Sequence, residues 1–142
     1  MTRVGFYIVE NSDPDSPLRL ALRLTEKAHR QGHRIFLNCS NEDEARGLDE
    51  RLWTYRSASF VPHALITDSA SEQVCIAWGQ DPEGHDDLLI NLCIDVPSFM
   101  SRFKRVAELV NQEPHRLEAL RSSWRHYRER GYSLEEHRLA SV

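Results

Sequence analysis

RVGFYIVENSDPDSPLRLALRLTEKAHRQGHRIFLNC, residues 3–39, decides the fold. Residues 3–9 form a compact apolar and β-branched run, which predicts a buried strand. A cluster of turn residues follows, and then an amphipathic segment, residues 17–31, predicts a helix that ends at Gly32. Residues 33–39 are a second apolar run and predict a second strand. A strand, a helix and a strand with short connections form a βαβ unit, in which the strands are parallel and the crossover is right-handed.

The rest of the chain continues the alternation of helices and strands. Asn41 and Glu44 resemble a capping box at the start of a second helix. Residues 104–110 are ambiguous, because they alternate like a strand and could also begin a helix. The other predicted elements are a helix over 41–55, strands over 73–79 and 87–93, one helical turn in 96–103 and a last helix from Pro114 to about Arg130. We therefore expect a single domain, residues 1–142, with an α/β fold of three α/β/α layers around a mostly parallel twisted sheet.

Composition and charge are those of an ordinary soluble protein, with 40% hydrophobic and 28% charged residues. The net charge of −4 argues against broad affinity for DNA or RNA, which relies on neutralising many phosphates, but it leaves room for a local basic patch. No apolar run is long enough for a transmembrane helix, and the apolar segment near the N-terminus is too short for a signal peptide. Three scattered cysteines, Cys39, Cys75 and Cys93, predict reduced thiols in a cytoplasmic protein.

An α/β sheet invites comparison with nucleotide-binding enzymes. A dinucleotide-binding fold needs glycines after its first strand, so that the backbone can approach the pyrophosphate. This chain has ENSDPDSP there, residues 10–17, and it contains neither GxGxxG nor GxxxxGK[ST]. We therefore expect a Rossmann-like sheet without a phosphate-binding loop and without a cofactor. A nucleotide-binding hydrolase or transferase remains the alternative.

The sequence predicts neither a catalytic residue nor a metal site. His29 and His33 have the spacing of metal ligands, but Gly32 stands between them at the predicted helix end, so the two rings need not share a face. His63 has no serine or cysteine nucleophile in a recognisable setting. The acidic run at 41–44 is explained by the preference of helix starts for negative charge.

The last predicted helix combines an indole with arginines. Its apolar edge includes Trp124, and Arg121, Arg125 and Arg128 fall just beyond that edge. Arginine binds carboxylates bidentately and stacks on aromatic faces. Such a surface could receive a short acidic peptide that ends in an apolar residue and a free carboxylate. An amphipathic helix whose polar rim is simply rich in arginine would give the same pattern.

A second feature is a pair of aromatics around the end of the second predicted helix. Trp53 projects away from the apolar stripe of that helix, and Phe60 lies in a segment that Pro62 keeps extended. Neighbouring exposed aromatics are typical anchors of protein interfaces. The alternative is that both fold back to cover an edge of the sheet.

Several segments together resemble the chi subunit of bacterial DNA polymerase III. They are LDERLW and SFVPH within 48–63, HRIFLNC at 33–39, INL at 90–92 and WRHYRERGY at 124–132. The resemblance runs nearly end to end and at similar length. It implies a non-catalytic accessory subunit of the clamp-loader complex in DNA replication, with a nucleotide-binding type of fold that binds no nucleotide.

The resemblance also implies two protein partners and only indirect contact with DNA. The psi subunit, which tethers chi to the clamp loader, contacts aromatics of the family that fall on Trp53 and Phe60. The acidic C-terminal tail of single-stranded DNA-binding protein binds a second surface, and certain helicases also contact chi. The tail-binding positions and the charges beside them fall on Val110, Arg121, Trp124, Arg125, Arg128 and Tyr132.

The chain departs from the family pattern in two respects. Some members have a tyrosine where this chain has Trp124, which keeps a flat hydrophobic wall. Some members have a lysine one turn before the key arginine, where this chain has Leu117. Arg116 or Arg125 could supply that second charge. The sequence leaves both possibilities open.

Overall fold

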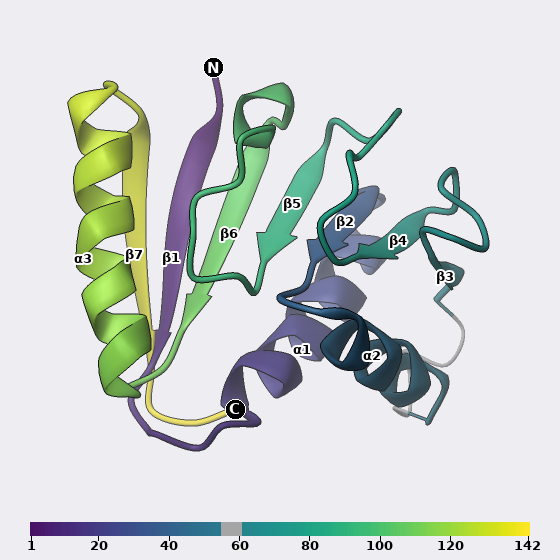
Figure 1. The fold of residues 1–142 in the computed structure, drawn as a ribbon, viewed down its shortest axis with the longest axis horizontal. Coiled ribbons are helices and arrows are strands. Elements are labelled where there is room, and N and C mark those ends of the chain that lie inside the picture. Colours follow the sequence, from purple (N-terminus) through teal and green to yellow (C-terminus); the bar gives the residue numbers. More distant parts are fainter. Residues whose placement is uncertain (55–60) are drawn as a thin grey trace.

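A sheet of seven strands runs through the centre of the protein (Figure 1). The structure, a computed structural model, describes residues 1–54 and 61–142. The strands are β1 (Arg3–Val9), β2 (Ile35–Asn38), β3 (His63–Leu65), β4 (Val74–Ala77), β5 (Leu88–Asn91), β6 (Arg105–Val110) and β7 (Ser133–Leu139). Their order across the sheet is β3-β4-β2-β5-β6-β1-β7, and neighbouring strands are parallel throughout. The outer strands are therefore β3 and β7.

Apolar side chains cover both faces of the sheet. The helices are α1 (Ser16–Arg30), α2 (Glu42–Thr54) and α3 (Pro114–Glu129), with a short 3₁₀ turn η2 (Met100–Arg102). Leu20 of α1 and Leu48 of α2 belong to a buried cluster on one face. Tyr127 of α3 and Met100 of η2 belong to a second cluster on the other face. The predicted three-layer α/β/α fold is confirmed.

The βαβ unit predicted from the N-terminal stretch is present, but its two strands are not neighbours. β1 and β2 are parallel, and β5 and β6 lie between them. The ambiguous segment is the strand β6, which pairs with β1 on one side and β5 on the other. Val106 faces the cluster that includes α3, and Ala107 faces the cluster that includes α1. This alternation is the period of a strand.

The two outer strands were not predicted from the sequence. β3 has three residues, too few for a periodic pattern. β7 reads SLEEHRL and carries charges instead of an apolar run. Arg138 of β7 pairs with Glu10 at 3.0 Å and with Glu136 at 2.6 Å. Charged side chains are common on outer strands, because they discourage pairing with a further chain.

The predicted capping box at the start of α2 is present, shifted by one residue on one side. Asn41 Oδ1 accepts a hydrogen bond from the Glu44 amide at 2.8 Å, and Glu44 Oε1 accepts one from the Ser40 amide at 2.8 Å. Asn41→Ala should therefore lower the free energy of unfolding by about 1 kcal/mol, as measured by urea denaturation. Asn41→Ser keeps an acceptor oxygen and should retain most of that stability. If the alanine variant is as stable as the parent chain, the Asn41 cap does not stabilise α2.

Candidate functional site

Trp53 lies on the solvent side of α2, where the helix approaches the outer strand β3. Its side chain is 60% exposed. The ring centroid is 4.4 Å from that of His63 on β3, and the two ring planes are tilted by 56°. The prediction that Trp53 lies off the apolar stripe is confirmed, whereas Phe60 lies outside the described residues. We call Trp53, His63 and Asp49 the edge surface.

The buried ring of His63 packs against the indole of Trp53. Its side chain is 0% exposed, and its Nδ1 lies 2.7 Å from the Val61 carbonyl oxygen, so Nδ1 donates to that carbonyl. Nε2 then faces Asp49 Oδ1 at 3.6 Å, and desolvation raises the pKa of the Asp49 carboxyl. These contacts hold the imidazole in place, and the imidazole in turn restricts the indole. The sequence did not predict this role, because a histidine on a three-residue strand belongs to no periodic pattern.

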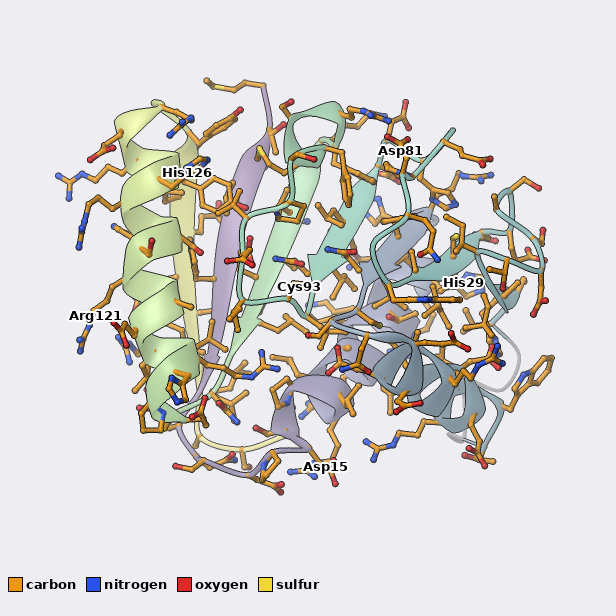
Figure 2. All side chains as sticks on the ribbon, in the orientation of Figure 1. Asp15, His29, Asp81, Cys93, Arg121 and His126 are labelled. Carbon is orange, nitrogen blue, oxygen red and sulfur yellow. The ribbon has the colours of Figure 1, made fainter. Side chains whose placement is uncertain are left out.

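Three exposed arginines lie on the same helix, α3, as a half-buried indole. Trp124 is half-buried, and its ring centroid lies 5.1 Å from that of Phe6 on β1, tilted by 48°. Arg121, Arg125 and Arg128 are exposed, and within residues 1–54 and 61–142 no carboxylate lies within 4.0 Å of their guanidinium nitrogens. In Figure 2 the side chain of Arg121 points outward from α3, away from the sheet. We call Arg121, Trp124, Arg125 and Arg128 the helix surface.

A buried polar network holds α3 against the sheet. The Tyr127 hydroxyl donates to Glu108 Oε2 at 2.6 Å, and Asn91 Nδ2 donates to Glu108 Oε1 at 2.8 Å. Burial raises the pKa of the Glu108 carboxyl to about 7, while the two hydrogen bonds oppose that shift. Glu108 is the single acid within the apolar run at the end of β6, and this is the sequence signal for the network.

The structure separates the remaining two predicted residues. Val110 pairs in register with Ile8, and Tyr132 immediately precedes Ser133, which pairs with Arg3. Tyr132 therefore lies six strand residues from the level of Val110, which at about 3.3 Å per residue is roughly 20 Å. The predicted tail-binding residues therefore form an elongated strip along α3 instead of one compact pocket.

The surroundings of these two residues also differ. Val110 is 7% exposed and lines a cavity of about 10 Å³ with Arg116 and Leu120. Tyr132 is half-buried beside the C-terminal end of α3, with its ring centroid 5.9 Å from that of Tyr127. Among the predicted tail-binding residues, Tyr132 and the helix surface expose substantial side-chain area to solvent. Val110 exposes very little side-chain area.

Arg116 and Arg125 are the two candidates for the positive charge that some family members carry as a lysine at the position of Leu117. Arg116 Nη1 donates to the Leu92 carbonyl oxygen at 3.2 Å, so its guanidinium is partly engaged inside the protein. Arg125 is exposed on the same side of α3 as Arg121. The geometry favours Arg125 as the second charge.

Metal and thiol chemistry find no support in the part of the chain that the structure describes. No group of three or more His, Cys, Asp or Glu side chains there is placed to hold a metal ion, and His33 Nδ1 instead lies 3.1 Å from Asp87 Oδ2. Burial raises the pKa of Cys93 to about 11 and that of Cys75 to about 12, so both thiols are neutral near pH 7. None of the described helices has the length and hydropathy needed to span a bilayer.

Comparisons with known proteins agree along the whole length of the chain. Residues 1–135 match the model of the family described as "DNA polymerase III chi subunit, HolC". The chain is 46% identical to DNA polymerase III subunit chi of Pseudomonas aeruginosa, over 100% of both chains. It is 30% identical to the Escherichia coli K12 protein of the same name, over 94% of this chain and 96% of that one. The corresponding Haemophilus influenzae protein is 28% identical over 91% of this chain and 92% of its own length.

A solved structure shares the fold without sharing the sequence. The crystal structure of T4 UvsW matches 99% of this chain and 42% of its own, with a TM-score of 0.74 and 5% sequence identity. At that identity the likeness concerns the fold alone. It places the seven-stranded parallel sheet among known architectures.

Proposed function

The chain belongs to the DNA polymerase III chi subunit family, and on that premise we propose that it bridges two other proteins of DNA replication. It is an accessory subunit of the polymerase and not a catalytic one. The first proposed partner is the psi subunit, which would tether the chain to the clamp loader. The second is the acidic C-terminal tail of single-stranded DNA-binding protein, through which the polymerase would be held near coated single strands.

The edge surface supports the proposed contact with psi. Trp53 presents an indole that is 60% exposed, and His63 holds it from below. A large aromatic that is already restricted loses little conformational freedom on binding, which is a property of interface anchors. An apolar contact of this kind would respond little to salt, because it buries surface instead of pairing charges.

The observation that carries the proposed contact with the tail is a half-buried indole beside three exposed, unpaired guanidiniums. Arg121, Arg125 and Arg128 can each bind a carboxylate bidentately, and Trp124 offers a flat apolar surface for a terminal side chain. The strip from the level of Val110 to that of Tyr132 is roughly 20 Å long, about the span of six residues of extended chain. An acidic, extended tail fits this shape and charge.

Substitution of one arginine tests the tail contact. Arg121→Ala should weaken binding of a synthetic tail peptide by about 1.5–3 kcal/mol, the range for a hydrogen bond to a charged group, as measured by calorimetric titration. The matched control is Arg23→Ala, which removes an exposed arginine from α1 on the other face of the sheet. Binding of psi should be unchanged in both variants. If Arg121→Ala and the control bind the peptide equally, Arg121 is not part of the site.

A further inference from the structure

Two hollows lie side by side along α1, on the face of the sheet opposite α3. Their volumes are about 250 and 490 Å³. Both are lined by Tyr7, Leu24, Lys27 and His137. Because they share these residues, they form one continuous depression. We call it the α1 groove.

Small residues open the floor of the α1 groove. Ala107 of β6 lines the first hollow, and Gly5 of β1 pairs with it in register. A Cβ atom at Gly5 would lie 3.2 Å from the ring of Tyr7 and 3.7 Å from that of His137. Glycine therefore makes room for these two rings to lie close to the sheet.

Tyr7 and His137 form a flat aromatic pair within the groove. Their ring centroids are 4.6 Å apart and their planes differ by 14°, which is a stacked arrangement. Both side chains are half-buried, and both line each of the two hollows. A planar ligand can extend such a stack, because every aromatic ring offers a π face.

The walls of the α1 groove are positively charged. Lys27 and Arg23 project from α1, and Arg105 projects from the start of β6. No carboxylate among the described residues lies within 4.0 Å of the charged nitrogens of these three side chains. In a chain with a net charge of −4, three unpaired cations along one groove are a local concentration of positive charge.

The acids near the groove already have partners. Glu26 pairs with Arg30 at 3.2 Å, Glu135 pairs with Arg3 at 2.7 Å, and Asp87 lies 3.1 Å from His33. Arg30 neutralises Glu26 and Arg3 neutralises Glu135, so these two acids repel an anion less than free carboxylates would. The groove therefore keeps its positive potential.

From this combination we infer that the α1 groove binds a short stretch of single-stranded nucleic acid. Lys27, Arg105 and Arg23 contact successive phosphates, and a base stacks on the Tyr7–His137 pair. Stacking platforms beside a cationic track are the features with which proteins hold single strands without reading their sequence. With only a few cations the binding is weak and depends on salt. The inference stands apart from the proposed contacts with psi and with the tail, which use other surfaces.

An acidic peptide is the less suitable occupant of this groove. Extended peptides gain much of their affinity from main-chain hydrogen bonds to an open strand edge. The floor here is formed by the faces of β1, β6 and the outer strand β7, and β1 and β6 are paired on both sides. A groove over the face of a sheet presents side chains and not the main-chain edge of a strand. The groove instead offers flat rings and long cationic side chains, which match bases and phosphates.

Fluorescence anisotropy with a fluorescein-labelled oligothymidylate tests the inference on the full chain. The logarithm of the affinity should fall with the logarithm of the salt concentration with a slope of about −1.4 to −2, as expected for two or three phosphate contacts on a single strand. Lys27→Glu combined with Arg105→Glu should lower the affinity at least about tenfold, since it reverses two charges of the track. Lys104→Glu, in an exposed residue that lines neither hollow, is the matched control and should have little effect.

A second variant tests the aromatic pair. Tyr7→Leu keeps an apolar side chain but removes the ring, and it should weaken binding about tenfold, within the range for one stacked base. Binding that survives the double charge reversal overturns the inference. So does displacement of the strand by oligoglutamate of equal charge, which would show that charge alone is recognised. Displacement by thymidine monophosphate at equal nucleotide concentration would assign the groove to free nucleotides and overturn it as well.

Discussion

Glu108→Gln should raise the free energy of unfolding by about 3 kcal/mol above pH 7, relative to the parent chain, while leaving it nearly unchanged below pH 4.5. The folded protein holds the Glu108 pKa at about 7, whereas a glutamate carboxyl in water titrates near 4.5. Between these two values the folded state binds the proton and the unfolded state does not. The stability contributed by protonated Glu108 is thus fully present at low pH and is lost as the pH rises through 7.

Glutamine removes this dependence because it stays neutral and keeps both hydrogen-bonding positions. Its carbonyl can accept from Asn91, and its amide can donate to the Tyr127 oxygen. Urea denaturation at several pH values between 4 and 8 measures the difference between the two proteins. Tyr127→Phe is the companion variant: it removes a hydrogen bond that lowers the Glu108 pKa, so the fall in stability should continue to a higher pH and reach a larger total. If the free energy of unfolding varies with pH in the same way for Glu108→Gln and the parent chain, the Glu108 pKa is not raised.

Trp53→Ala should weaken binding to psi by at least about 2 kcal/mol, or roughly 30-fold, which is the threshold for an interface anchor. The indole is 60% exposed, so its loss should cost the free protein little stability. Co-purification of the two proteins gives a first measurement, and titration of the purified partners gives the affinity.

A matched control separates a lost anchor from a general loss of apolar surface. Ile94 is 50% exposed and lies in the loop after β5, so Ile94→Ala also truncates an exposed apolar side chain, but at another surface. It should leave psi binding unchanged. Full recovery of psi with the Trp53 variant would exclude Trp53 from the contact. Tail binding should be normal in the Trp53 variant, because that change does not touch the helix surface.

Those parts of the fold that repeat a strong pattern could be predicted from the sequence. The apolar runs of β1 and β2 and the amphipathic α1 set the class of the fold, and the helix stops at Gly32 and Gly131 have φ angles of 86° and 78°, in the left-handed region. The outer strands could not be predicted, because β7 carries charged residues in place of an apolar run and β3 is too short. The order of the strands was also out of reach, since it depends on pairings between distant segments.

The site residues follow the same division. The exposure of Trp53 and the arginine edge of α3 could be predicted, because both follow from helical geometry alone. The support of Trp53 by His63 joins two elements that no sequence period connects. The separation of Val110 from Tyr132 depends on the register of β1 with β6 and β7, which only the assembled sheet defines.

The strand order has a mechanical consequence. β3 and β7 are the first and last of seven strands, so six steps of about 4.8 Å put them roughly 29 Å apart. The edge surface adjoins one margin and α3 packs near the other. A hydrogen-bonded parallel sheet holds these two margins at a fixed separation. A short peptide bound along α3 should therefore leave the edge surface open, and its effect on binding there can be measured directly.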